Sequence, residues 1–117
     1  MILIVEDEAI SRRALQLLLK ANGYTARAAG SAEEALRMAA DGLVADVALV
    51  DVNLPGMDGV EMVRELQLRN PSLRPVYMTA CERDDLPAGC DTRSMRYLRK
   101  PLEVAALLDL IASATLA

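Results

Sequence analysis

Five polar side chains of this sequence stand at the ends of short apolar runs, where buried strands would end. Glu6 and Asp7 follow the first run, Asp51 the third, Thr79 the fourth and Lys100 the fifth. Three carboxylates in one crevice would repel each other, and a hard divalent cation, Mg²⁺ or Mn²⁺, would relieve that repulsion. A carboxylate can also attack phosphorus and form an aspartyl phosphate. These residue types predict a metal-assisted phosphoryl site with Asp51 as its nucleophile.

A transferring phosphoryl group carries charge on three oxygens, which explains the remaining members of the set. The metal can neutralise one oxygen, the ammonium group of Lys100 a second, and the hydroxyl group of Thr79 can donate to a third. Each residue also has an ordinary role. Asp51 could be a turn or cap residue, Glu6 and Asp7 could cap a helix, Thr79 could simply end a strand and Lys100 could be a solvated charge. Their joint position at one sheet edge favours the site.

Short apolar runs alternate with segments of helical periodicity along the chain. Asn22-Gly23 is typical of a helix end, and Ser31 with Glu34 forms a capping box that begins a helix. The alternation predicts a parallel sheet with helices on both faces, in which ligands bind beyond the carboxyl ends of the strands. The expected strands span residues 2–5, 24–29, 46–50, 75–78 and 96–98, and the clearer helices 9–21, 31–40, 59–69 and 103–114.

Composition and charge restrict the kind of protein. The 117 residues predict one domain over residues 1–117. A formal net charge of −4 gives no basic footprint for nucleic acid, and no apolar stretch is long enough to span a bilayer. Two cysteines make no disulfide framework, so a cytoplasmic location is expected. The absence of histidine excludes imidazole catalysis and His-ligated zinc.

Four motifs give the chain a resemblance to a known family. They are Ile4-Val5-Glu6-Asp7-Glu8, the segment from Asp51 through Asn53-Leu54-Pro55-Gly56-Met57-Asp58 to Gly59, Thr79-Ala80, and Tyr97-Leu98-Arg99-Lys100-Pro101. In this order, and over essentially the whole chain, the sequence resembles a receiver domain of the bacterial two-component response regulators. The resemblance implies a flavodoxin-like (βα)5 sandwich of three layers whose parallel sheet has the order 2-1-3-4-5.

The resemblance also implies a role for each matched acidic residue. Asp51 would accept a phosphoryl group from a histidine kinase or a histidine phosphotransfer protein, with Mg²⁺ (or Mn²⁺) as cofactor. Asp7 and Asp51 would bind the metal, Glu6 would act through a bound water, and Asn53 would offer its backbone carbonyl group. The protein would catalyse its own phosphorylation and dephosphorylation and would not otherwise be an enzyme.

Activation, as the resemblance implies it, is a conformational switch. Thr79 would bind the phosphoryl group and move toward it, Lys100 would pair with the phosphorylated Asp51, and Tyr97 would turn into the vacated space. Alternatively, Tyr97 is a half-buried strand aromatic whose hydroxyl group stays in water. The surface of the fourth helix, fifth strand and fifth helix would then change. A downstream effector domain or protein would read that surface, a homodimer could form through it, and no direct contact with nucleic acid or membrane is expected.

Residues 81–94 depart from the family pattern. Receivers commonly carry Gly-Ala shortly before the aromatic residue, and the segment 91–96 has neither residue. A short or shifted fourth helix is therefore expected. Cys81 and Asn53 would flank the path of an attacking water, so both could tune dephosphorylation. Because cysteine orients water poorly, a moderately long-lived phosphoryl group is predicted.

The helix at residues 9–21 offers candidate positions for docking of the kinase. Ile10, Ser11 and Leu15 are expected beside the acidic site. Ile10 or Leu15 could equally belong to the hydrophobic core, and the sequence leaves this open.

Two further functions compete with the phosphoacceptor. A phosphohydrolase of the haloacid dehalogenase type also combines an aspartate nucleophile with threonine and lysine. The motif typical of that class is Asp-x-Asp. This chain has Asn53 in place of the second aspartate and too little length for the core of such an enzyme with an additional cap domain. A binding-only receiver that is never phosphorylated is the other alternative, and the intact acidic set argues against it.

Overall fold

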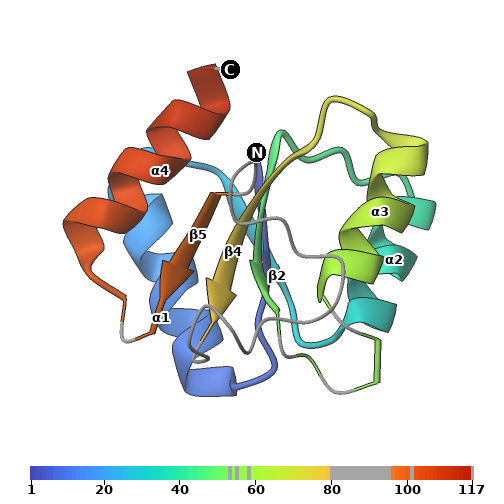
Figure 1. Cartoon of the computed structure of the whole chain (residues 1–117), viewed down its shortest axis with the longest axis horizontal. Helices are drawn as coiled ribbons and strands as arrows, with labels where there is room; N and C mark the ends of the chain where they lie inside the picture. The colour runs from blue at the N-terminus through green and yellow to red at the C-terminus, as the bar shows by residue number, and fades with distance from the viewer. Residues whose placement is uncertain (53, 55, 58, 80–95, 101, 117) are drawn as a thin grey trace.

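The computed structural model describes residues 1–52, 54, 56, 57, 59–79, 96–100 and 102–116. At its centre lies a five-stranded parallel sheet in the order β2-β1-β3-β4-β5 (Figure 1). The flavodoxin-like order expected from the sequence is confirmed. The strands are β1 (Ile2–Val5), β2 (Ala26–Ala29), β3 (Val47–Asp51), β4 (Arg74–Thr79) and β5 (Arg96–Arg99).

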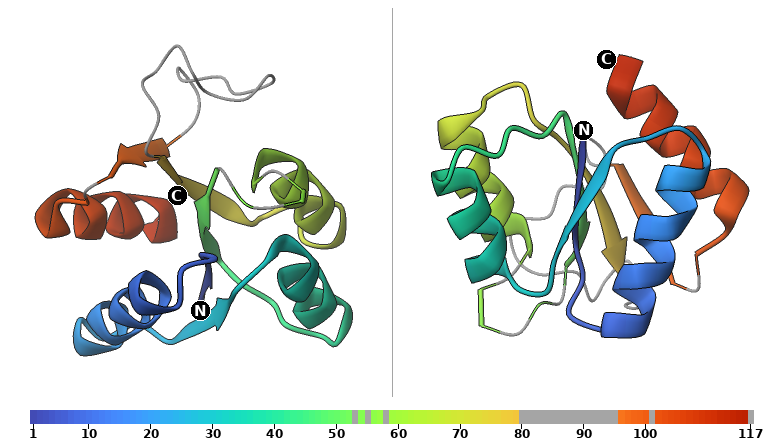
Figure 2. Two further views of the ribbon diagram at one scale, coloured as in Figure 1. Left: turned by 90° about the horizontal axis from the view of Figure 1, so that it is seen from below. Right: turned by 180° about the vertical axis from the view of Figure 1, so that it is seen from behind.

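Helices cover both faces of the sheet. On one face lie α1 (Ala9–Ala21) and α4 (Val104–Leu116), and on the other α2 (Ala32–Ala40) and α3 (Gly59–Arg69), as Figure 2 shows. The helix expected within residues 81–94 lies outside the described residues, so α4 is the helix predicted at 103–114. Within the described part of the chain, no helix combines the length and apolar character that crossing a bilayer requires.

Side chains of the central strands point alternately to the two faces of the sheet, so each face has a hydrophobic core. Leu3 and Val5 of β1 belong to the core beneath α2 and α3, whereas Ile2 and Ile4 belong to the core beneath α1 and α4. Successive side chains of a strand point to opposite faces, so a central strand covered on both sides is apolar throughout. All five residues of β3 are buried, and its last residue, Asp51, is the one that carries a charge. The packing therefore holds Asp51 at a rigid position.

The end of α1 explains where β2 begins. Gly23 has a φ of 88°, its amide donates to the Lys20 carbonyl oxygen at 3.1 Å, and the Tyr24 amide donates to the Leu19 carbonyl oxygen at 3.0 Å. This pair of bonds is the Schellman motif, in which glycine accepts a left-handed conformation. The helix end predicted from the sequence is confirmed. Because Tyr24 completes the cap, β2 begins at Ala26 and not two residues earlier, as the sequence suggested.

Candidate functional site

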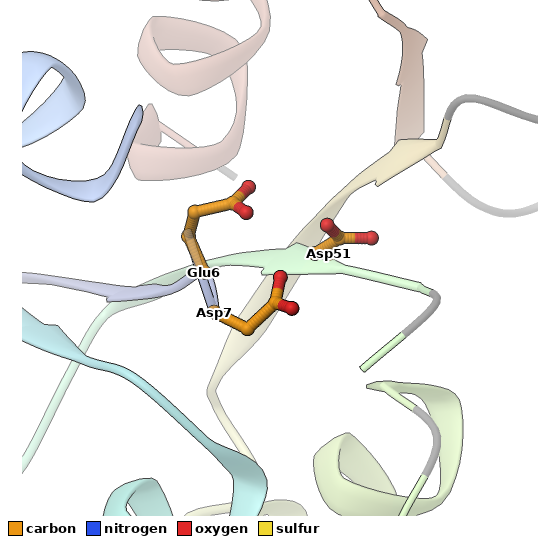
Figure 3. A group of neighbouring side chains, drawn as sticks. All are labelled: Glu6, Asp7 and Asp51. Atoms are coloured by element: carbon orange, nitrogen blue, oxygen red, sulfur yellow. The ribbon is translucent and has the colours of Figure 1, made fainter. Parts of the chain in front are cut away.

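The carboxyl ends of the strands bring the predicted acidic residues together. The register pairs Val5 of β1 with Val50 of β3, so Glu6 and Asp7 follow β1 beside Asp51. One carboxylate oxygen from each of these three residues lies within 4.8 Å of the others. Figure 3 shows the three side chains gathered at the ends of β1 and β3.

Lys100 joins two of these carboxylates. Its Nζ atom donates to Oε2 of Glu6 at 2.9 Å and to Oδ2 of Asp51 at 2.8 Å. The side chains of Glu6 and Asp51 are 2% and 8% exposed, and that of Lys100 is 30% exposed. The shared ammonium group therefore offsets the cost of burying two carboxylates. Glu6 is a partner of Lys100 that the sequence did not indicate.

Burial and ion pairing shift the ionisation of these groups. Burial raises the pKa of Glu6 above its ordinary value and outweighs the opposing hydrogen bonds from Lys100 and the Glu8 amide. Burial also disfavours the charge of Lys100, but hydrogen bonds to Asp51 and Glu6 outweigh it and raise the pKa of Lys100. Lys100 is thus cationic throughout the neutral range, whereas Glu6 gives up its proton less readily than an exposed glutamate.

Glu6 and Asp7 are adjacent but lie in different environments. Oε1 of Glu6 accepts a hydrogen bond from the Glu8 amide at 3.2 Å, and Oε2 accepts one from Lys100. Both oxygens of Glu6 are therefore held by the chain. Asp7, in contrast, is exposed. The Asp7 carboxylate is therefore more accessible to an ion from solvent than that of Glu6.

Thr79 completes the set at the end of β4. Its side chain is buried, with 1% of the residue exposed. The Lys100 amide donates to the Thr79 carbonyl oxygen at 2.7 Å, which continues the pairing of Thr79 with Arg99 in β5. On the other side, β4 pairs with β3 through Met78 and Asp51. Thr79 and Lys100 thus occupy the same sheet edge as the acidic residues, as their strand-end positions predicted.

The beginning of α3 lies against the backbone of Asp51. A Cβ atom on Gly59 would stand 2.5 Å from the Asp51 carbonyl oxygen and 2.7 Å from Cγ1 of Val50. The Gly59 amide donates to the Val52 carbonyl oxygen at 3.1 Å. Glycine permits this approach because it has no side chain. The sequence placed Gly59 at a helix start, but nothing in its neighbours signalled the contact.

The other predicted site residues fall partly outside this geometry. The expected metal ligand Asn53 and the tuning residue Cys81 lie outside the described residues. Tyr97 lies in β5, where its backbone pairs with Tyr77 of β4. The switching role of Tyr97 stays a prediction.

The three candidate docking residues of α1 have different surroundings. Ile10 is 81% exposed, whereas Leu15 is 8% exposed and packs in the core beneath α1 and α4. Ser11 is partly buried and, with Leu15, lines a hollow of about 290 Å³ that reaches Glu6 and Lys100. Leu15 therefore takes the core position that the sequence left open for it. Ile10 is accessible to a partner.

The donor set fits a hard divalent cation. The three carboxylates and the ammonium group of Lys100 together carry a formal charge of −2. Oxygen donors of this kind favour Mg²⁺ or Mn²⁺ over softer metals. The cluster Glu6, Asp7 and Asp51 can therefore bind such an ion, and it lies beside a cationic side chain suited to phosphoryl oxygens.

Known proteins share this sequence pattern. Residues 2–112 match the family described as response regulator receiver domain. The chain is 39% identical over 116 residues to the uncharacterized transcriptional regulatory protein YkoG of Bacillus subtilis, covering 97% of this chain and 50% of that protein. It is 35% identical over 107 residues to a cyclic di-GMP phosphodiesterase of Thermotoga maritima, covering 91% of this chain and 28% of that protein. The chain spans from roughly a quarter to half of the length of these relatives.

Solved structures share the fold. A response regulator receiver domain protein from Clostridium thermocellum superimposes with a TM-score of 0.86 at 26% identity, covering 97% of this chain and 92% of that one. The receiver domain of the hybrid histidine kinase CckA gives a TM-score of 0.82 at 26% identity, covering 97% of both chains. With the match to the family over residues 2–112, these similarities show that the chain belongs to the response regulator receiver domains of two-component systems.

Proposed function

We propose that this receiver domain accepts a phosphoryl group on Asp51 from the phosphohistidine of a histidine kinase or a histidine phosphotransfer protein. The position of Asp51 carries the proposal. Its Oδ2 atom lies 2.8 Å from Nζ of Lys100, and its carboxylate lies within 4.8 Å of those of Glu6 and Asp7. A nucleophile beside a fixed cation and a metal-binding cluster meets the electrostatic needs of phosphoryl transfer.

The transfer begins with attack of an Asp51 carboxylate oxygen on phosphorus. A new O–P bond forms while the P–N bond to the donor imidazole breaks, and the imidazole keeps the electron pair of that bond. Lys100 is already cationic and can shift its hydrogen bond from the carboxylate to a phosphoryl oxygen, while the Thr79 hydroxyl group can donate a hydrogen bond to another. Asp7, Asp51, the carbonyl group of Asn53 and, through water, Glu6 would hold Mg²⁺, which would supply positive charge against the phosphoryl oxygens.

Hydrolysis of the aspartyl phosphate returns the domain to its starting state. The domain is thus its own substrate and not an enzyme that releases a modified external molecule. Cys81 and Asn53 would set the lifetime of the phosphoryl group, because they would flank the path of the attacking water. Since cysteine orients water poorly, hydrolysis would be slow. This proposal is supported by the matched positions of both residues in the sequence.

The phosphoryl group would change the charge beside Asp51, and this change would alter the surface that partners recognise. Phosphorylation replaces the single negative charge of the Asp51 carboxylate with a phosphoryl group that carries about −1.5 to −2, beside Thr79 and Lys100. The backbones of these two residues are joined by a 2.7 Å hydrogen bond between β4 and the end of β5. Movement of Thr79 would therefore reach β5, and with it Tyr97. An effector domain or protein, or a second copy of the chain, would read the surface of β5, α4 and the helix expected within 81–94.

The experiment is phosphorylation by a small donor. The full chain is incubated with acetyl phosphate and MgCl2, and the intact protein is weighed by mass spectrometry. Asp51→Asn removes the proposed nucleophile, and Asp109→Asn, at an exposed position of α4, is the matched control. One added phosphoryl group is expected on the wild-type and Asp109→Asn proteins and none on Asp51→Asn.

The same experiment separates the competing functions. Continuous release of phosphate without an adduct would indicate a phosphohydrolase. No reaction with the small donor or with a phosphorylated kinase would indicate a binding-only receiver. An adduct that persists on Asp51→Asn would place the acceptor elsewhere and overturn the proposal.

A further inference from the structure

Arg12 reaches from α1 back to the turn that carries Glu6 and Asp7. Its Nη1 atom donates to the carbonyl oxygen of Glu6 at 3.0 Å and to that of Asp7 at 3.5 Å. Arg12 is half-buried, whereas the next residue, Arg13, is exposed. Both acceptors are backbone oxygens, so the guanidinium group binds the turn itself and not its carboxylates.

The two carbonyl groups belong to the peptide units on either side of the Asp7 Cα atom. Each peptide unit is planar, and the φ and ψ angles of Asp7 are the rotations between these two planes. The guanidinium group bonds the first plane at 3.0 Å and lies 3.5 Å from the carbonyl oxygen of the second, so it limits the rotation between them and with it the direction of the Asp7 side chain. Glu6 has side-chain anchors in Lys100 and the Glu8 amide. Among the described residues, the contacts that orient the exposed Asp7 are the bonds from Arg12 to its backbone.

Gly30, in the turn after β2, makes room for the guanidinium group. A Cβ atom at this position would lie 2.8 Å from Nη1 of Arg12, closer than side chains tolerate. The Gly30 amide donates to Oε2 of Glu34 at 2.9 Å, and the Glu34 amide donates to Oγ of Ser31 at 3.1 Å. The Ser31 half of the capping box predicted from the sequence is thus present, whereas the Glu34 carboxylate accepts from the amide of Gly30, the residue before the N-cap. The start of α2 therefore holds Gly30 beside Arg12.

We infer that Arg12 is a positioning residue, which orients Asp7 for metal binding through the two peptide units around it. This inference rests on the proposed function, because it assigns Asp7 to the metal. Partners that orient a metal ligand from outside the coordination shell commonly account for about tenfold or more of the affinity. A ligand that is already oriented loses less conformational freedom when the ion binds.

The test compares the Mg²⁺ affinity of the wild-type full chain with that of its variants, in the absence of any phosphodonor. MgCl2 is titrated, and the dissociation constant is taken from the shifts of the backbone amide resonances. Arg12→Ala is expected to weaken binding about tenfold. Arg12→Lys should restore part of the loss, because the ammonium group keeps the charge and the ability to donate but lies at the end of a shorter side chain that reaches the two carbonyl oxygens less well. Arg13→Ala removes the same charge from an exposed site and should change the constant by less than about twofold.

Gly30→Ala tests whether the position of the Arg12 guanidinium group, and not only its charge, contributes to Mg²⁺ binding. This variant keeps the guanidinium charge, but the added methyl group displaces Nη1 from the two carbonyl oxygens. It should weaken Mg²⁺ binding as Arg12→Ala does. The double variant should bind no more weakly than Arg12→Ala alone, because both changes remove the same contact.

The outcomes distinguish this inference from the proposed function. If the wild-type protein binds Mg²⁺ and Arg12→Ala binds it equally tightly, or if Arg13→Ala weakens binding as much, the inference is wrong while the proposed metal site stands. If the wild-type protein does not bind Mg²⁺, the metal site fails and the inference fails with it. Thermal unfolding of each metal-free variant reports folding. Should Arg12→Ala not fold, Arg12→Lys and Gly30→Ala decide the question, because both keep the cation.

Discussion

Replacement of Lys100 by methionine would test whether its ammonium group is what allows two carboxylates to be buried at the sheet edge. Methionine keeps an unbranched apolar side chain but removes the charge that bonds Glu6 at 2.9 Å and Asp51 at 2.8 Å. Both carboxylates are more than nine-tenths buried. In metal-free buffer the variant would therefore hold two buried negative charges without their counter-ion.

The expected loss follows from the burial of the three side chains. Removal of one partner from a buried ion pair costs about 3–5 kcal/mol. Because 30% of the Lys100 side chain is exposed, solvent screens part of this effect, and the raised pKa of Glu6 allows it to take up a proton. We therefore expect the lower end, about 3 kcal/mol. At about 4 °C per kcal/mol for a domain of this size, Tm should fall by roughly 10 °C.

Differential scanning calorimetry in EDTA and in MgCl2 is the assay. Lys20→Met, at the other lysine of the chain and exposed in the last turn of α1, is the matched control and should change stability by about 0.5 kcal/mol or less. MgCl2 should restore part of the Lys100→Met loss, because the ion supplies the missing positive charge. A Lys100→Met protein as stable in EDTA as Lys20→Met would refute the reasoning.

Three further changes probe the same sheet edge. Because burial raises the pKa of Glu6 above 4.5, the folded state holds its proton more tightly, and stability falls as the pH rises through that raised pKa. Glu6→Gln removes this loss, so its metal-free Tm should exceed that of the wild-type protein at about pH 8 and converge with it near pH 4. Asp7→Asn removes a carboxylate within 4.8 Å of two others, which should raise metal-free stability by about 1 kcal/mol and abolish the rise in Tm with MgCl2. Gly59→Ala should cost about 1–3 kcal/mol and lower the phosphorylation yield, because the methyl group displaces the Asp51 carbonyl oxygen. Gly42→Ala, with a φ of 104° but open space around it, should lower stability without changing that yield.

Each of these expectations has an outcome that contradicts it. A Tm difference for Glu6→Gln that is the same at both pH values would show that burial does not control its protonation. An Asp7→Asn protein that still gains stability from MgCl2 would remove Asp7 from the metal site. Equal phosphorylation yields for Gly59→Ala and Gly42→Ala would show that the close approach of α3 does not matter to the acceptor.

The sequence alone determined the order of the elements and the edge at which the polar residues gather. Alternation along a strand and the abrupt end of an apolar run are local features, so β1 and the position of Asp51 could be predicted from them. The prediction of β2 was less accurate because Tyr24, a good strand residue, is used by the cap of α1. A cap depends on a backbone conformation that residue types favour but do not impose.

The tertiary structure decided which groups meet. Lys100 bonds Glu6, 94 residues away, and Asp51, 49 residues away. It also decided that Leu15 is core while Ile10 is exposed, which helical periodicity left open. The physical reason is that periodicity places a residue on a face or at an edge, whereas the distance between two side chains depends on how whole elements pack. The position of Asp51 at the sheet edge could thus be predicted from its strand, but the cation that bonds it is set by the packing of β1, β3, β4 and β5.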